Sequence, residues 1–133
     1  SLTAATGATT LRQGWIYDLM VGIYDTPADN VISWKIDRQT TVGTATTGVA
    51  NPLHPSDAAG LLEENLWATI EPTVTTDTEQ VEIPVNARAS YRWVAAPGGE
   101  LVIPATNVTG LGLRAKSAAY TGTGAQGTVH YWE

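Results

Sequence analysis

The chain has 133 residues and a hydrophobic content of 43%, which is enough for one globular domain with a packed core. Its 13 acidic and 7 basic side chains give a net charge of −6, which argues against a nucleic acid partner because phosphate binding requires a basic surface. The absence of cysteine excludes disulfides, thiolate metal sites and cysteine nucleophiles.

The N-terminal residues 1–10 are small and polar, and we expect them to form an extended arm that becomes ordered only against another surface. The remaining residues, 11–133, are expected to form a single domain. In residues 11–25 the apolar side chains fit both a helical and a strand period. Gly14 and Gly22 weaken a helix, whereas β-branched and aromatic residues favour a strand, so a strand is the preferred interpretation.

No segment resembles a targeting signal or a membrane span. The most apolar early stretch, residues 15–24, contains Asp18 and is too short to cross a bilayer. An opening at Ser1 fits the removal of an initiator methionine. We therefore expect a soluble protein that is made in the cytoplasm and has no membrane partner.

Alternation returns in residues 31–37, where Ile32, Trp34 and Ile36 share one face of a predicted strand. Residues 39–57 show no period, and an irregular stretch of this length is typical of a functional or contact-making loop.

The middle of the chain gives weaker signals. Ser56 or Asp57 could cap a short helix that continues through Glu64. Residues 66–74 are predicted to form a strand, and residues 75–79 a polar turn that ends it.

The clearest signal begins at Val81, after which apolar and polar residues alternate without interruption. It predicts one long strand over residues 81–94, with one dry and one solvated face. Residues 111–120 also alternate, and residues 121–124 read as a hairpin turn into a returning strand, 125–132. Seven or eight such short strands are typical of an antiparallel all-β sandwich, and we expect it to be jelly-roll-like.

No catalytic constellation is evident. The only histidines, His54 and His130, lack metal-ligand spacing, and no serine lies in a nucleophile elbow. Residues 122–127 match the dinucleotide-binding fingerprint, but too few residues follow for the helix that it requires. The acidic side chains between residues 57 and 82 are expected to form a solvated surface, although 76–79 faintly resembles a calcium loop. We expect no metal, no cofactor and no enzymatic activity.

Basic side chains dominate the last third of the chain. They occupy even positions, opposite the apolar side chains of their strands: Arg88, Arg92, Arg114 and Lys116. If these strands are neighbours, the four form one basic patch that could dock an acidic partner, including the acidic middle of another copy. The alternative is that these charges serve solubility alone.

The chain contains five tryptophans and five tyrosines but no phenylalanine. Core packing accounts for most of them, especially Trp34 and Trp93, although these residue types also suit interfaces. Exposed aromatic rings would equally suit stacking on sugars. The candidates for such stacking are Trp15, Tyr17, Tyr120 and Trp132.

One part of the chain resembles a known class of proteins. Residues 91–106, YRWVAAPGGELVIPAT, lead to GLGLR at 110–114 and AYTGT at 119–123. In pattern and composition this region, residues 81–133, is similar to small β-rich virion proteins of tailed bacteriophages.

The resemblance implies a non-enzymatic decoration or cement protein of the phage head, located in the virion. Such proteins bind the major capsid protein of the assembled shell, are often homotrimers, and use extended arms to clamp neighbouring subunits. The contact residues expected on this basis are Leu2, Thr3 and Thr6 of the arm, with Arg88, Arg92, Arg114 and Lys116.

Three functional hypotheses follow. A decoration protein that binds only the assembled shell would stabilise it by mass action, and deletion of residues 1–10 should then abolish shell binding without unfolding the domain. A carbohydrate-binding sandwich on a phage fibre or host-recognition protein is the alternative. A hydrolase that uses paired acids is the third, and it lacks any motif that fixes a geometry.

Overall fold

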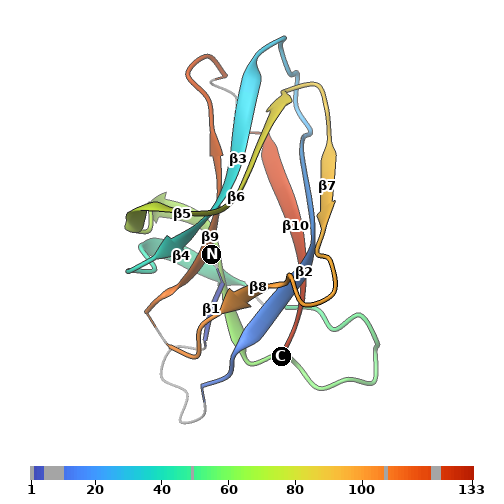
Figure 1. Cartoon of the computed structure of the whole chain (residues 1–133), viewed down its shortest axis with the longest axis vertical. Helices are drawn as coiled ribbons and strands as arrows, with labels where there is room; N and C mark the ends of the chain where they lie inside the picture. The colour runs from blue at the N-terminus through green and yellow to red at the C-terminus, as the bar shows by residue number, and fades with distance from the viewer. Residues whose placement is uncertain (1, 5–10, 49, 107, 121–123) are drawn as a thin grey trace.

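The computed structural model describes residues 2–4, 11–48, 50–106, 108–120 and 124–133, and every regular element among them is a β-strand. The strands are β1 (Leu2–Ala4), β2 (Gly14–Ile23), β3 (Val31–Gln39), β4 (Thr44–Gly48), β5 (Leu62–Ile70), β6 (Val74–Asn86), β7 (Tyr91–Val94), β8 (Leu101–Ile103), β9 (Gly110–Lys116) and β10 (Ala125–Trp132). They form two antiparallel sheets packed against each other, which confirms the predicted all-β sandwich (Figure 1). The jelly-roll connectivity stays a prediction.

The two sheets differ in size. The six-stranded sheet has the order β4-β5-β1-β9-β3-β6, and the four-stranded sheet has the order β10-β2-β7, with β8 also paired to β2. Strands β7 and β8 pair with different parts of β2: Trp93 lies opposite Leu19, and Leu101 lies opposite Ile16. Every pairing among the described residues is antiparallel.

The hydrophobic core lies between the sheets. Strand β3 contributes Ile32, Trp34 and Ile36, all buried, which confirms the alternation predicted for this segment. The four-stranded sheet contributes Ile16 and Leu19, among others, to the same core. Burial of each such side chain contributes about 1.5–3 kcal/mol relative to exposure, so this interface supplies most of the stabilisation of the sandwich.

Strand β2 confirms the strand interpretation of residues 11–25, but its alternation is interrupted. Ile16 pairs with Tyr131 and Asp18 pairs with His130, so Tyr17 is an extra residue that forms a β-bulge. Because of the bulge, Ile16 and Leu19 both reach the core although they are three residues apart. Asp18 is left on the opposite, outer face of the sheet.

The prediction of one long strand over residues 81–94 is wrong. Strand β6 ends at Asn86, a turn follows, and β7 belongs to the other sheet. The side-chain oxygen of Asn86 accepts a hydrogen bond from the backbone N–H of Arg88 at 2.9 Å, a local bond that favours a turn. Apolar and polar residues continue to alternate across this turn, so the sequence pattern did not indicate it.

The predicted turn and helix in the middle of the chain are also wrong. Residues 75–79 lie within β6, where the pairing with β3 is irregular and Asp77 has a φ of 59°. Instead of a helix through Glu64, the chain forms β5, because Leu62 packs into the core and pairs with Ala4. Of the region 39–57, Gln39 is the last residue of β3 and Thr44–Gly48 forms the short strand β4, while the other described residues form no helix or strand.

Residues 121–123 of the predicted hairpin turn lie outside the described residues. Strands β9 and β10 belong to different sheets, so the two strands do not pair as a hairpin. Strand β10 returns as predicted, but it pairs with β2.

The described part of the predicted N-terminal arm, residues 2–4, is not an extended arm. Leu2–Ala4 is β1, which lies between β5 and β9 in the six-stranded sheet. Leu2 and Thr3 are 8% and 0% exposed, so they are held in their own sheet and are not available as the predicted partner contacts. The strand fits here because Leu2 faces the core, and Gly110 lets its carbonyl approach closely. Thr6 lies outside the described residues.

Candidate binding face on the four-stranded sheet

One face of the four-stranded sheet points away from the core and gathers aromatic and polar side chains. We call it the outer face. Strand β10 places His130 and Trp132 on it, and their neighbours on β2 are Asp18 and Trp15. Strand β7 adds Arg92, which lies opposite the exposed Met20. The outer face therefore comprises Trp15, Tyr17, Asp18, Met20, Arg92, Val94, Thr128, His130 and Trp132.

The aromatic rings on this face are stacked. Trp15 and Trp132 pair across β2 and β10, with ring centroids 4.3 Å apart and planes 15° apart. Tyr17 stacks on His130 at 6.2 Å. Trp132 remains 49% exposed, so the stack offers one open ring surface to a partner. Stacked rings on two paired strands are fixed before binding, which lowers the entropy lost on docking.

Beside the rings, Asp18 anchors a charged cluster. Its carboxylate is only 3% exposed, and it accepts two hydrogen bonds from Arg92, at 2.9 and 2.7 Å. His130 Nδ1 lies 3.1 Å from the same carboxylate. The Arg92 hydrogen bonds, aided by His130 and opposed by burial, lower the pKa of Asp18 to about 2. Asp18 therefore stays ionised at neutral pH and holds Arg92 in a fixed orientation.

The Asp18–His130 pair resembles part of a hydrolase triad, which also requires a nucleophile on the other ring nitrogen. In the described part of the chain no hydroxyl makes a hydrogen bond to His130. Arg92 already binds both carboxylate oxygens of Asp18. The Asp18 carboxylate can therefore orient the Arg92 guanidinium and the His130 ring. The described residues also include no cluster of three or more His, Asp or Glu side chains that could hold a metal ion.

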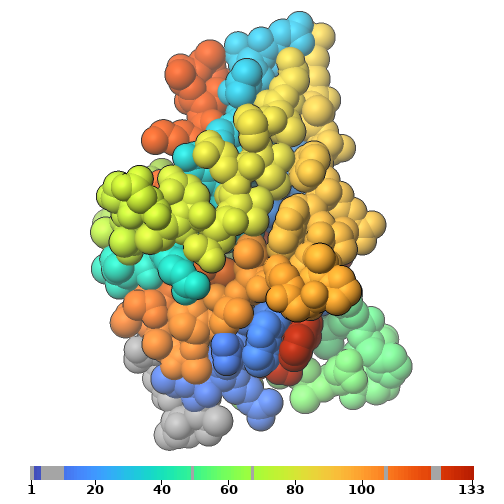
Figure 2. Space-filling view, in the orientation of Figure 1, coloured from blue at the N-terminus to red at the C-terminus, as the bar shows by residue number. Residues whose placement is uncertain are grey.

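Two hollows extend along the outer face. The larger, about 540 Å³, lies between β10 and the loop that precedes β5, where Trp132, His130 and Tyr17 face Asn51 and Asp57. This loop stands out beside the C-terminal end of the chain (Figure 2). A second hollow of about 320 Å³ is lined by Met20 and Arg92, among others. Thr128 lines both hollows, so they follow one another along β10.

The loop beside the larger hollow is tethered to the end of the chain. Glu133 accepts a hydrogen bond from the backbone N–H of Leu61 at 2.8 Å. Gly60 permits this contact, because a Cβ there would lie 2.6 Å from the Glu133 carboxylate. The wall of the hollow is therefore attached at its base to the strand that carries Trp132.

The predicted single basic patch is wrong. Arg92 belongs to the four-stranded sheet, whereas Arg114 and Lys116 lie on β9 of the six-stranded sheet, and Arg88 lies in the turn after β6. Three of these side chains are paired within the chain. The pairs are Arg88–Asp29 at 3.4 Å, Arg92–Asp18 at 2.7 Å and Arg114–Asp37 at 2.6 Å. The prediction failed because β7 and β9, which carry Arg92 and Arg114, are not neighbouring strands.

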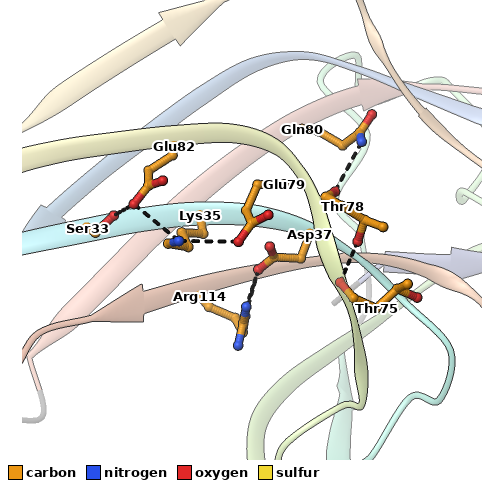
Figure 3. Close-up of polar contacts among 9 residues, drawn as sticks. All are labelled: Ser33, Lys35, Asp37, Thr75, Thr78, Glu79, Gln80, Glu82 and Arg114. Atoms are coloured by element: carbon orange, nitrogen blue, oxygen red, sulfur yellow. Dashed lines mark hydrogen bonds and ion pairs between the residues drawn. The ribbon is translucent and has the colours of Figure 1, made fainter.

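The acidic region that was expected to be simply solvated is partly neutralised on the six-stranded sheet. Lys35 lies between Glu79 and Glu82, at 3.3 and 3.2 Å, and Ser33 donates a hydrogen bond to Glu82 at 2.6 Å (Figure 3). The Ser33 hydroxyl and the Lys35 ammonium together lower the pKa of Glu82. Strands β3 and β6 thus carry a network in which Lys35 neutralises part of the charge of Glu79 and Glu82.

Three of the four aromatic residues proposed for sugar stacking lie on the outer face. They are Trp15, Tyr17 and Trp132. Tyr120 does not join them, since its hydroxyl donates a hydrogen bond to Asp25 at 2.5 Å. Asp18 was not predicted as a site residue. An acid inside an otherwise apolar strand was the available signal, but the bulge at Tyr17, which brings Trp15 and Asp18 onto one face, has no mark in the sequence.

No protein-family model, curated protein or solved structure matches this chain. Among the described residues there is no helix of the length and hydrophobicity that a membrane crossing would require.

Proposed function

We propose that this protein is a non-enzymatic virion protein of the decoration type, which docks on the assembled phage shell through the outer face. The observation that carries this proposal is the composition of that face. Trp, Tyr, Met and Arg are the residues enriched where binding energy concentrates in protein interfaces, and here Trp132, Met20 and Arg92 occur together. We name the shell as the partner because of the resemblance to virion proteins.

The electrostatics of the face support a protein partner. Arg92 is exposed but bound to Asp18, so its charge is fixed in place and largely compensated. A partner that covers it gains a rigid donor without having to desolvate a free cation. In this proposal Arg92 remains a contact residue, whereas Arg88, Arg114 and Lys116 lie elsewhere. The trimer proposed from the resemblance would present three outer faces to the major capsid protein.

The test is co-sedimentation of the protein with shells assembled from the major capsid protein of the same phage. Trp132→Ala and Met20→Ala, which leave the Asp18–Arg92 pair intact, should each weaken binding by about 30-fold, as expected for a contact worth about 2 kcal/mol. Ile70→Ala removes an exposed side chain from the six-stranded sheet and serves as the control. Equal occupancy of shells by all three variants would refute docking through this face.

The N-terminal strand gives a second test of the same proposal. Deletion of residues 1–4 removes β1 and uncovers Leu62 and Leu111 of the neighbouring strands. We therefore expect the deletion to destabilise the fold, in contrast to the sequence-based expectation of an intact domain. Circular dichroism and thermal unfolding measure this directly.

A second candidate function, carbohydrate binding, is favoured by one specific observation. The larger hollow combines the rings of Tyr17 and Trp132 with the polar side chains of Asn51 and Asp57. Apolar ring surfaces with a few polar groups are the usual composition of a small-molecule site. A glycan array and tryptophan fluorescence test it. Asn51→Ala should reduce sugar binding and spare shell binding, whereas Met20→Ala should do the reverse.

A further inference from the structure

Strand β10 forms an edge of the four-stranded sheet, and the loop that precedes β5 lies beside the C-terminal part of this strand across the larger hollow. In the described part of the chain it pairs with β2 only. Its sequence, AQGTVHYW, contains no charged residue and no proline, which are the usual means of blocking further pairing. The longest edge of the other sheet, β6, carries Pro84, Glu82 and an irregular register. The contrast marks β10 as the edge that is open to another strand.

The register identifies the backbone groups that face outward. The backbone N–H of Tyr24 donates to the carbonyl of Gly124 at 3.0 Å, one step beyond the pair formed by Ala125 and Ile23. Hydrogen-bonded and non-hydrogen-bonded pairs alternate along an antiparallel ladder. Residues 126 and 128 therefore bond to β2, while residues 127 and 129 direct their N–H and C=O groups to the free edge.

An apolar cleft lies beside this edge. It has a volume of about 380 Å³ and opens between β10 and β5, where Val129 faces Leu66. Its floor is made by core side chains of both sheets, including Ile16, Leu111 and Leu113. A strand added to β10 would direct every second side chain toward this cleft, since the side chains of a strand alternate between its faces.

The charge along the cleft has one sign. Glu64 lines this cleft and also the larger hollow further along β10, which Asp57 and Glu133 line as well. None of the seven basic side chains of the protein lines either. Within the described residues the carboxylate of Glu64 forms no hydrogen bond or ion pair, and the backbone of Glu64 pairs with Leu2 and Gly48 in the sheet. Burial, with the charges of Glu64 and Glu133, raises the pKa of Tyr131 to about 12, as expected at a negative site.

We propose that β10 accepts an extended segment of a partner protein by strand addition, and that this segment carries apolar side chains at alternate positions and a lysine or arginine facing Glu64. Backbone hydrogen bonds to Gly127 and Val129 give affinity, and the cleft and Glu64 select the sequence. This site uses the backbone edge of β10 and the cleft, whereas shell docking uses the side chains of the outer face, so the proposal holds whether or not the face docks on a shell.

The probe is a seven-residue peptide that alternates valine and threonine and has a lysine at each end. In amide NMR of the full chain, its addition should slow hydrogen exchange at Gly127 and Val129. The amides of Gln126 and Thr128 should change little, because they already bond to β2. Glu64→Lys should weaken binding three- to tenfold, as for the loss of one interfacial ion pair, while Glu71→Lys, an exposed acid that does not line the cleft, should not.

Three results would overturn the proposal. The first is equal binding of a peptide with glutamate in place of both lysines. The second is protection of amides outside β10 when the peptide binds. The third is a dimer in analytical ultracentrifugation that Val129→Pro dissociates, because the edge would then be occupied by a second copy. Thermal unfolding of Glu64→Lys establishes that the variant is folded.

Discussion

The Asp18–Arg92 pair gives the sharpest prediction for stability. The substitution Asp18→Asn keeps the shape of the side chain but removes its charge, and Arg92 and His130 then lose their anionic partner. The pKa of Asp18 falls from 3.8 to about 2 in the folded state, mainly because of the Arg92 hydrogen bonds. Such a shift corresponds to at most about 2.4 kcal/mol, and screening of the largely exposed Arg92 reduces it to about 1–2 kcal/mol.

The sign of the pH dependence follows from the lowered pKa. The stabilisation is fully present above the unfolded value of 3.8 and is lost as the pH falls toward about 2, where Asp18 takes up a proton in the folded state. Urea unfolding followed by tryptophan fluorescence should show that the wild-type protein is more stable than Asp18→Asn at pH 7. The difference should shrink between pH 4 and pH 2.

Asp29→Asn is the matched control, because Asp29 pairs with Arg88 at 3.4 Å and both side chains are exposed. We expect this substitution to cost less than about 0.5 kcal/mol. A difference between wild type and Asp18→Asn that is equally large at pH 7 and pH 2 would contradict the electrostatic explanation. So would an equal effect of both substitutions.

Two further predictions concern packing. Gly110→Ala should destabilise the fold by about 3 kcal/mol in urea unfolding, because its Cβ would lie 2.1 Å from the carbonyl oxygen of Leu2, whereas Gly127→Ala meets only the flexible end of Leu113 and should cost less than about 1 kcal/mol. Equal costs would refute this assignment of the close strand approach. Tyr131→Phe should be neutral or stabilising by up to about 1 kcal/mol in thermal unfolding, since the buried hydroxyl has no hydrogen-bond partner among the described residues; a clear loss of stability would reveal a missed bond.

The sequence predicted the fold class and several strands because these depend on local alternation. Ile32, Trp34 and Ile36 alternate and are all buried, and Trp34 packs in the core as expected. Alternation does not say where a strand ends. The turn after Asn86 preserves the apolar–polar pattern, so the pattern alone could not separate β6 from β7.

The candidate site was predictable only in part, for a similar reason. Trp15, Tyr17 and Trp132 were identified by residue type, but their common face depends on the pairing of β2 with β10, which are far apart in sequence. The predicted patch of basic residues failed because sheet membership is a long-range property. Arg92 and Arg114 have the same local pattern, yet the topology assigns them to different sheets.

The position of β1 has a consequence for how the chain folds. Leu2 pairs with Glu64 on one side and with Leu111 on the other, so the centre of the larger sheet closes only after most of the polypeptide is in place. Contacts that join such distant segments slow the search for the native state and prolong the lifetime of partly assembled forms. During that interval the apolar side chains beneath β1 lie open, and chaperone dependence or aggregation at high expression is the expected outcome.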